Sequence, residues 1–250
     1  MAVASMIVRS NHPVALIIGA GDAIGSAISE KFAENGHVVC MARRNSDRLA
    51  PLVEQLASRA LAAHAFSCDA RDEEQVVNLF AAIERDIGEI DVVVFNVGAN
   101  VPMSILDTSV RKFTKIWEMA CFAGFLTGRE AAKTMLPRNR GTIIFTGATA
   151  SLRGGANFGA FASAKHGLRA LAQSMARELG PKNIHVAHVV IDAAVETDWI
   201  KQNHPAYEEL AAADGIVKPK DLAANYLMLH KQPKNAWTFE LDVRPATEKW

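Results

Sequence analysis

The chain is predicted to fold as a single α/β domain, a doubly wound parallel sheet of about seven strands with helices on both faces. Short apolar runs alternate along its 250 residues with longer segments of helical periodicity, the pattern of a parallel sheet with crossover helices. Several apolar runs are continuous, as in strands buried on both faces. No Pro-, Gly- or Ser-rich linker divides the sequence, so residues 1–250 are treated as one domain.

Seven segments are predicted to be strands. The first reads VALII and the fourth reads DVVVF, runs without a polar face. The last segment alternates apolar and polar residues, which favours a strand at the edge of the sheet. In chain order the predicted strands are Val14–Ile18, His37–Met41, His64–Ser67, Asp91–Phe95, Gly141–Thr146, Ile184–Ile191 and Trp237–Val243.

The segments between these strands carry helical signals. In Ala23–Asn35 the apolar residues recur at helical spacing, and the glycine that follows is typical of a helix C-cap. Asp72–Ile87 opens with an acidic first turn, which suits the positive end of the helix dipole. The other predicted helices are Ser46–Ala62, Ser109–Trp117, Glu118–Leu136, Asn157–Gly180 and Pro219–Lys231.

Composition excludes several classes of function. The 27 Lys and Arg residues balance 27 Asp and Glu residues, which argues against a nucleic-acid partner and against attachment to an anionic membrane. No apolar run approaches the roughly 18 residues that a membrane span needs. The first twelve residues lack a basic region ahead of their apolar stretch, so we expect a loose leader and not a signal peptide.

The three cysteines, Cys40, Cys68 and Cys121, are far apart in the sequence and lack metal-ligand spacing. They are predicted to be buried small hydrophobic residues, and the sequence predicts no metal site. A sparse, odd set of cysteines is typical of a reducing compartment, so a cytoplasmic location is expected.

A glycine-rich segment follows the first predicted strand and opens the first predicted helix. It reads Gly19-Ala20-Gly21-Asp22-Ala23-Ile24-Gly25. Glycine lets the backbone turn tightly and approach a pyrophosphate closely, while the helix N-terminus offers unpaired N–H groups. Because the segment lies between a strand and a helix, it predicts dinucleotide binding, with a plain turn as the alternative.

The residues after the second strand indicate which dinucleotide is bound. An acid at this position would hold the hydroxyls of the adenosine ribose and repel a 2′-phosphate. The sequence has Arg43 and Arg44 instead, and a guanidinium binds phosphate through paired hydrogen bonds. We therefore expect NADP(H) to be favoured over NAD(H), with a solvated basic turn as the alternative.

Four further motifs follow the glycine-rich segment in order: Cys68–Asp72, Asn96–Ala99, Phe161–Lys165 and Asp192–Thr197. Together the five motifs resemble those of the short-chain dehydrogenase/reductase family over nearly the whole chain. Cys68–Asp72 (CDARD) resembles its adenine-contacting segment, and Asn96–Ala99 (NVGA) resembles its NNAG turn. Phe161–Lys165 (FASAK) occupies the position of YxxxK, and Asp192–Thr197 (DAAVET) that of PGxxxT. The resemblance implies a Rossmann-type fold and an oxidoreductase that moves a hydride between NADP(H) and a carbonyl or alcohol.

The resemblance also implies roles for single residues. Asp69 would bond the adenine amine, Lys165 the nicotinamide-ribose hydroxyls, the backbone of Val195 the carboxamide, and Thr197 the carboxamide or the pyrophosphate. A lid over the substrate would span about residues 198–218. The family's pairing of long helices implies a homodimer or homotetramer. The cofactor-binding set is Gly19, Gly21, Asp22, Ile24, Gly25, Arg43, Arg44, Asp69, Ala70, Asn96, Val97, Gly98, Lys165, Val195 and Thr197.

The sequence departs from the family at the positions of the residues that transfer protons during catalysis. The family uses a tyrosine as proton donor, a serine that orients the carbonyl and an asparagine that holds a water relay. Here the tyrosine position is Phe161, the serine position 13 residues earlier is Ala148, and the asparagine position is Ala120, while Lys165 is retained. General acid catalysis typically contributes about 10²–10⁴-fold in rate, so cofactor binding is the firmer expectation and ordinary ketone reduction the weaker one.

Two functions therefore stay open. One is an NADP(H)-dependent oxidoreductase with an atypical mechanism, in which Lys165 or a lid group such as Tyr207 gives the proton. The other is a non-catalytic NADP(H)-binding sensor or partner subunit. Asp192 either reaches the nicotinamide pocket or caps its loop. The substrate is not predicted, and a structural role is favoured over a catalytic one for Thr146, Thr149, Ser151, Ser163, His166, His185, His188 and Tyr207.

The C-terminal segment Trp237–Trp250 lacks the glycines that usually end the last strand in this family. Its aromatic residues indicate an anchored terminus. It is expected either to reach into a neighbouring subunit or to pack on its own chain.

Overall fold

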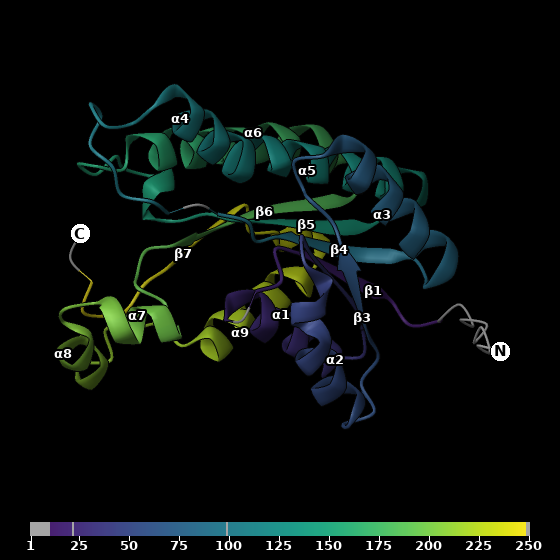
Figure 1. Cartoon of the computed structure of the whole chain (residues 1–250). Coiled ribbons are helices and arrows are strands. Elements are labelled where there is room, and N and C mark those ends of the chain that lie inside the picture. Colours follow the sequence, from purple (N-terminus) through teal and green to yellow (C-terminus); the bar gives the residue numbers. More distant parts are fainter. Residues whose placement is uncertain (1–10, 22, 99, 249–250) are drawn as a thin grey trace.

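The computed structural model describes residues 11–21, 23–98 and 100–248, and its centre is a seven-stranded sheet (Figure 1). All neighbouring strands pair in parallel, in the order β3-β2-β1-β4-β5-β6-β7. The winding reverses between β1 and β4, so the predicted doubly wound, Rossmann-type fold is confirmed. The strands are β1 (Val14–Ile18), β2 (Val38–Arg43), β3 (Ala63–Ser67), β4 (Ile90–Phe95), β5 (Gly141–Thr146), β6 (Ile184–Ile191) and β7 (Glu240–Val243).

Helices cover both faces of the sheet (Figure 1). One layer holds α3 (Glu73–Asp86), α4 (Val110–Trp117), α5 (Ala123–Met135) and α6 (Gly159–Leu179). The opposite layer holds α1 (Ile24–Ala33), α2 (Ala50–Ala57) and α9 (Pro219–His230). The short helices α7 (Asp198–Asn203) and α8 (Tyr207–Ala212) lie apart from both layers. No helix among the described residues is long and apolar enough to cross a bilayer.

The sheet separates two apolar clusters. Every residue of β1 is buried, and alternate residues enter opposite clusters, Leu16 toward α3 and α5 and Ile17 toward α1 and α9. This is why the strand has no polar face. Fully burying a side chain of this size stabilises the fold by about 1.5–3 kcal/mol. The two clusters fix the sheet between its helices, so the loops at the carboxyl ends of the strands are held in place.

The predicted helix Ser46–Ala62 is shorter than expected and begins differently. Residues 46–49 form a 3₁₀ turn, which the side chain of Asn45 caps by accepting a hydrogen bond from the Asp47 amide. The α-helix α2 follows with Pro51 in its first turn, where the missing N–H costs nothing. It ends at Ala57, and Ala60, with φ of 57°, turns the chain toward β3.

Two further segments differ from the prediction. The segment Glu118–Leu136 begins as a π-helical turn at Glu118–Phe122 before α5, and such turns are frequent at functional sites. The weakly periodic segment after residue 197 contains α7 and α8. Each has only six residues, too few for the apolar spacing of a helix to repeat.

Candidate cofactor and active site

The glycine-rich loop after β1 has no room for side chains at two positions. Gly19 has φ of +87°, and a Cβ atom there would lie 2.5 Å from the backbone oxygen of Asn96. A Cβ atom on Gly25 would lie 2.7 Å from the Cα of Ala20. The amide side chain of Asn96 donates to the Gly19 carbonyl at 3.1 Å, which ties the end of β4 to the loop. Asp22, also predicted to bind the cofactor, lies outside the described residues.

A cavity of about 610 Å³ lies at the carboxyl ends of β1, β2 and β4. It brings together nine of the residues predicted to bind the cofactor: Gly19, Gly21, Arg43, Arg44, Asp69, Ala70, Asn96, Val97 and Gly98. Arg48 and Arg71 also line it, although the sequence prediction did not include them. Four arginines and one aspartate among the described lining residues make this cavity suited to a phosphorylated ligand.

Asp69 forms a paired ion contact on the wall of this cavity. The guanidinium of Arg71 donates to its two carboxylate oxygens at 2.9 and 2.6 Å. These hydrogen bonds hold the pKa of Asp69 below its ordinary value. The carboxylate is therefore ionised, and part of its capacity to accept hydrogen bonds is already used by Arg71.

A second cavity, of about 320 Å³, contains the three residues predicted to form the reaction site. Ala148, Phe161 and Lys165 all line it, together with Ile24 and Val195. It shares the wall of residues 96–98 with the arginine-lined cavity. The two spaces therefore form neighbouring halves of one groove along the carboxyl edge of the sheet.

Lys165 is the polar centre of the second cavity and is only 3% exposed. Its ammonium donates to the backbone oxygen of Thr146 at 2.8 Å and to that of Val97 at 3.2 Å. Burial lowers its pKa to about 8. An ammonium has three donors, so one remains available for a ligand in the cavity.

The wall beside Lys165 is hydrocarbon. Phe161 is 7% exposed, and its ring centroid lies 5.8 Å from the Lys165 nitrogen. Ala120, in the π-helical turn, is fully buried in the same small apolar cluster as Phe161, and Ala148 packs against that cluster. The structure thus brings the three departures from the family pattern to one place, where the tyrosine, serine and asparagine would otherwise meet.

The hydroxyl groups near the fifth strand are engaged in structural contacts. The hydroxyl of Thr146 is hydrogen-bonded to the buried Tyr226 hydroxyl at 2.8 Å. The Ser151 hydroxyl accepts from the Ala148 amide at 3.1 Å, and the Ser163 hydroxyl donates to the Ala160 carbonyl at 2.9 Å. None of these three contacts directs a hydroxyl proton toward a ligand position.

The remaining alternative proton donors are likewise bound elsewhere. Tyr207 donates to the Glu196 carboxylate at 3.0 Å. Each of three histidines has a ring nitrogen within 3.0 Å of a backbone or carboxylate oxygen: His166 with Ala162, His185 with Thr238 and His188 with Glu240. These contacts agree with the structural role that the sequence favoured for them.

Asp192 is buried but belongs to an ion network that reaches the surface, because the Arg153 side chain is 47% exposed. Its carboxylate accepts from the Thr149 hydroxyl at 2.6 Å and from both terminal nitrogens of Arg153 at 3.0 Å, and Arg244 lies 3.2 Å away. Burial alone would raise its pKa, but the hydrogen bonds from Thr149 and Arg153 outweigh burial and lower it. Asp192 is not among the described residues that line the Lys165 cavity. Of the two roles considered, the contacts favour the loop cap.

Val195 and Thr197, both predicted to bind the cofactor, line different cavities in the structure. Val195 pairs with Val217 in an isolated parallel bridge and lines the Lys165 cavity. Thr197 caps α7, because its hydroxyl accepts from the Ile200 amide at 3.0 Å. It lines a different cavity, between α1 and α7. Binding of the cofactor by Thr197 stays a prediction that this arrangement does not support.

The described part of the C-terminal segment packs on its own chain. The Trp237 ring stacks on His185, with centroids 4.9 Å apart. Arg244 pairs with Asp192, and the carboxylate of Glu248 lies 3.8 Å from Arg153. These contacts favour the own-chain alternative over insertion into a neighbouring subunit.

Comparisons with known proteins agree with this geometry. The family model described as short chain dehydrogenase matches residues 13–208. A short-chain dehydrogenase structure from Rhodopseudomonas palustris is 48% identical, with a TM-score of 0.81, and the match covers 93% of this chain and 98% of that one. The 3-oxoacyl-[acyl-carrier-protein] reductase of Bos taurus is 28% identical over 188 residues, 75% of this chain and 78% of its own. A tyrosine-to-phenylalanine variant of ElxO with NADPH bound shares the fold, at 21% identity and a TM-score of 0.84 over 92% of this chain and 96% of its own. The chain belongs to the short-chain dehydrogenase family of oxidoreductases.

Proposed function

We propose that the chain binds NADP(H) in preference to NAD(H) along the groove at the carboxyl edge of the sheet. The observation that carries the proposal is the arginine cluster, because Arg43, Arg44 and Arg48 line the same cavity as the glycine-rich loop. One charge-assisted hydrogen bond contributes about 1.5–3 kcal/mol, which is roughly a tenfold to hundredfold difference in affinity. The two tight glycines fit a backbone that must approach a pyrophosphate closely.

The same groove offers partners for the rest of a dinucleotide. Ala70 and the Asp69–Arg71 pair line the arginine-rich half, where they would hold the adenine. The remaining donor of Lys165 would bind the hydroxyls of the nicotinamide ribose, and the backbone of Val195 the carboxamide. When bound, the cofactor supplies or accepts the hydride. Phe161 and Ala148 would then exclude water from the reacting face.

We further propose that any proton needed for the reaction is held at Nζ of Lys165. Its pKa of about 8 leaves the ammonium charged at neutral pH but able to release a proton more readily than an exposed lysine. The carbonyls of Thr146 and Val97 orient the nitrogen without removing its charge. Because the third donor would bind the ribose hydroxyls, one of those hydroxyls would pass the proton from Nζ to a substrate carbonyl beside the Phe161 ring.

A second function is supported by the apolar wall itself. Because Ala120, Ala148 and Phe161 form an apolar cluster and two of them line the Lys165 cavity, the alternative function is a non-catalytic NADP(H)-binding sensor or partner subunit. ElxO with its tyrosine replaced by phenylalanine holds NADPH, which supports binding without that hydroxyl. This second function requires tight NADPH binding, no consumption, and a protein that copurifies.

The cofactor proposal is tested by fluorescence titration with NADPH and NADH. Arg43→Asp should shift the ratio of the two dissociation constants toward NADH by at least about tenfold, because it replaces an attraction for the 2′-phosphate with a repulsion. The matched control is Arg85→Asp on α3, whose partner is Asp86. An unchanged ratio in Arg43→Asp would refute the proposed preference.

The two functions are separated by a turnover screen of the same protein. Aldehydes, ketones, imines and alcohols are tested at several pH values with the preferred cofactor. Turnover at saturating NADPH that Lys165→Met removes, in a variant that still binds NADPH, supports the enzyme with the proton at Lys165. Tight binding without turnover on any class supports the non-catalytic function.

A further inference from the structure

Three potential metal ligands meet at the opposite, amino-terminal edge of the sheet. His37 precedes β2, Asp91 lies at the start of β4, and His230 is the last residue of α9. Their nearest ligand atoms all lie within 4.8 Å of one another. We propose that these three side chains bind one divalent transition-metal ion, with Zn²⁺ as the expected species, at a site separate from the cofactor groove.

His37 gives the first reason. It is 7% exposed, and neither ring nitrogen has a hydrogen-bond partner of normal geometry among the described residues, although the Phe32 carbonyl lies nearby. Its ring packs edge-on against His230, with centroids 5.2 Å apart. A buried imidazole with two unused nitrogens costs about 1–3 kcal/mol per unsatisfied group. A metal ion would use one nitrogen and remove the cost at that atom.

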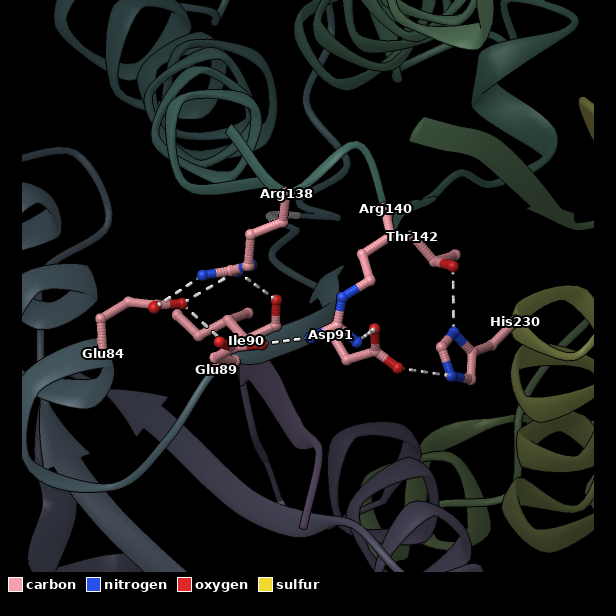
Figure 2. A network of polar contacts seen from close by, with 8 residues as sticks. All are labelled: Glu84, Glu89, Ile90, Asp91, Arg138, Arg140, Thr142 and His230. Carbon is pink, nitrogen blue, oxygen red and sulfur yellow. Dashed lines mark hydrogen bonds and ion pairs between the residues drawn. The ribbon is translucent and has the colours of Figure 1, made fainter. Parts of the chain in front are cut away.

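The pair formed by Asp91 and His230 gives the second reason (Figure 2). The Nε2 atom of His230 lies 3.4 Å from Oδ2 of Asp91. This is long for a hydrogen bond between charged groups, which is about 2.7–2.9 Å. It matches the separation of two ligands on a tetrahedral ion with bonds of about 2.0–2.1 Å, which is roughly 3.3 Å.

The surroundings also orient the ligands. Nδ1 of His230 lies 2.9 Å from the Thr142 hydroxyl, which can accept its proton and leave Nε2 free for a metal. Arg140 approaches the other oxygen of Asp91, at 3.7 Å, and also pairs with Glu89 (Figure 2). Arg140 therefore does not hold the Asp91 oxygen that faces His230.

The donor set selects the class of metal. Two imidazoles and one carboxylate suit Zn²⁺, which takes nitrogen and oxygen ligands and accepts water as a fourth, whereas Ca²⁺ and Mg²⁺ require mostly oxygen ligands. The three ligands come from the α1–β2 junction, β4 and α9. An ion would therefore cross-link three segments that are distant in sequence and would stabilise the folded state by mass action.

The test begins with the whole wild-type chain, freed of metal by chelation. Calorimetric titration with ZnCl₂ should give one ion per chain. The midpoint temperature of thermal unfolding should rise by about 5 °C or more when free Zn²⁺ is a hundredfold above its dissociation constant. Titration with CoCl₂ should give the strong visible absorption of a four-coordinate ion. Absence of Zn²⁺ binding at millimolar concentration would overturn the proposal. A Co²⁺ titration that gives only the weak spectrum of the hydrated ion would also overturn it.

Variants assign the ligands. His37→Gln, Asp91→Asn and His230→Gln should each weaken Zn²⁺ binding by at least a hundredfold, while the matched control His64→Gln, a histidine on β3, should not. Each variant is first checked for a cooperative unfolding transition without metal. If His37→Gln does not fold, the near-isosteric Asp91→Asn carries the same expectation. Unchanged binding in the folded ligand variants would refute the site.

Discussion

At the scale of single residues, the exchange of three polar groups for hydrocarbon has two opposite effects on the reaction site. It removes the hydroxyl and amide groups that the family uses to move protons. It also leaves the retained Lys165 beside the hydrocarbon of Phe161 and Ala148, in a site where burial brings the lysine pKa to about 8. One acid is thus lost, while the lysine that remains releases a proton closer to neutral pH than an exposed lysine would.

The triple variant Ala120→Asn, Ala148→Ser and Phe161→Tyr tests whether the scaffold still supports the family's chemistry. With the relay restored beside Lys165, NADPH-dependent reduction of a ketone or aldehyde should rise by about 10²–10⁴-fold. The rate is followed by NADPH absorbance. The double variant that keeps Phe161 is the control and should stay slow, because it lacks the phenolic proton.

A triple variant that folds and binds NADPH but shows no gain in rate on any substrate class would count against an intact scaffold. It would mean that the lid or the loop after β5 holds substrate away from Lys165.

The buried His188 makes stability depend on pH. It is fully buried, and its Nδ1 lies 3.0 Å from the Glu240 carboxylate. Burial lowers its pKa to about 4, whereas an unfolded histidine takes up its proton near pH 6.5. As pH falls from 6.5 to 4, the unfolded chain therefore binds one proton more, and the free energy of unfolding drops by up to about 3 kcal/mol.

Urea unfolding of wild type and His188→Gln between pH 7 and pH 4 measures this effect. The variant should lose less stability over that interval, by up to about 3 kcal/mol, whatever its stability at pH 7. Only the difference in slope between the two proteins is attributed to His188, because other buried histidines titrate in both. Parallel curves would contradict the prediction.

The residues of the site were predictable where a motif fixes their spacing. Ala148, Phe161 and Lys165 line one cavity because the predicted strand and helix that carry them are adjacent in sequence. Arg48 was missed because it lies outside the motifs, and Arg71 was missed although it lies within Cys68–Asp72, because the motif assigns a role only to Asp69. The cluster of His37, Asp91 and His230 has no sequence spacing at all, since only the order of the strands brings the three residues together.

At the scale of elements, alanine substitutions at Gly19 and Gly36 distinguish the cost of backbone strain from the cost of steric crowding. Their φ values are +87° and +88°, but a Cβ atom would strike the Asn96 carbonyl at Gly19 and nothing within 4 Å at Gly36. Gly36→Ala should lower the free energy of unfolding by about 1–2 kcal/mol, the cost of a left-handed alanine. Gly19→Ala should cost more and weaken NADPH binding.

Chemical denaturation and NADPH titration of the two variants check this prediction. Equal losses of stability would mean that the loop after β1 can move away from β4, and the close fit to Asn96 would then not position the cofactor.

The elements themselves were predictable to different degrees. The strands β1, β5 and β6 match their predicted bounds, because continuous apolar runs end at clear turn signals. The π-helical turn at Glu118–Phe122 was not predictable, since its residues have ordinary helical composition. The π-helical turn packs against α6 and the Phe161 cluster. Such tertiary packing cannot be predicted from the local sequence pattern.

At the scale of the whole molecule, the helical layer that holds α4 and α5 carries a partly exposed aromatic row. Trp117, Phe122 and Phe125 stack in sequence along the π-helical turn, with ring centroids 6.4 and 6.1 Å apart. Val110 and Phe113, on α4, are 84% and 38% exposed. The family resemblance implies a homodimer or homotetramer through the long helix α6, and we propose that this neighbouring face extends that contact, because apolar surface of this kind typically marks an interface.

Light scattering of Phe113→Glu tests that assembly. A carboxylate buried in an apolar contact is costly, because it loses its water without gaining a partner. The wild-type mass should be at least twice that of one chain, and the variant should shift toward the monomer at the same concentration. The control is Trp199→Glu on α7, where a 67% exposed aromatic lies away from both helical layers. A monomeric wild type, or dissociation of the control alone, would show that α4 and α5 face solvent or another partner.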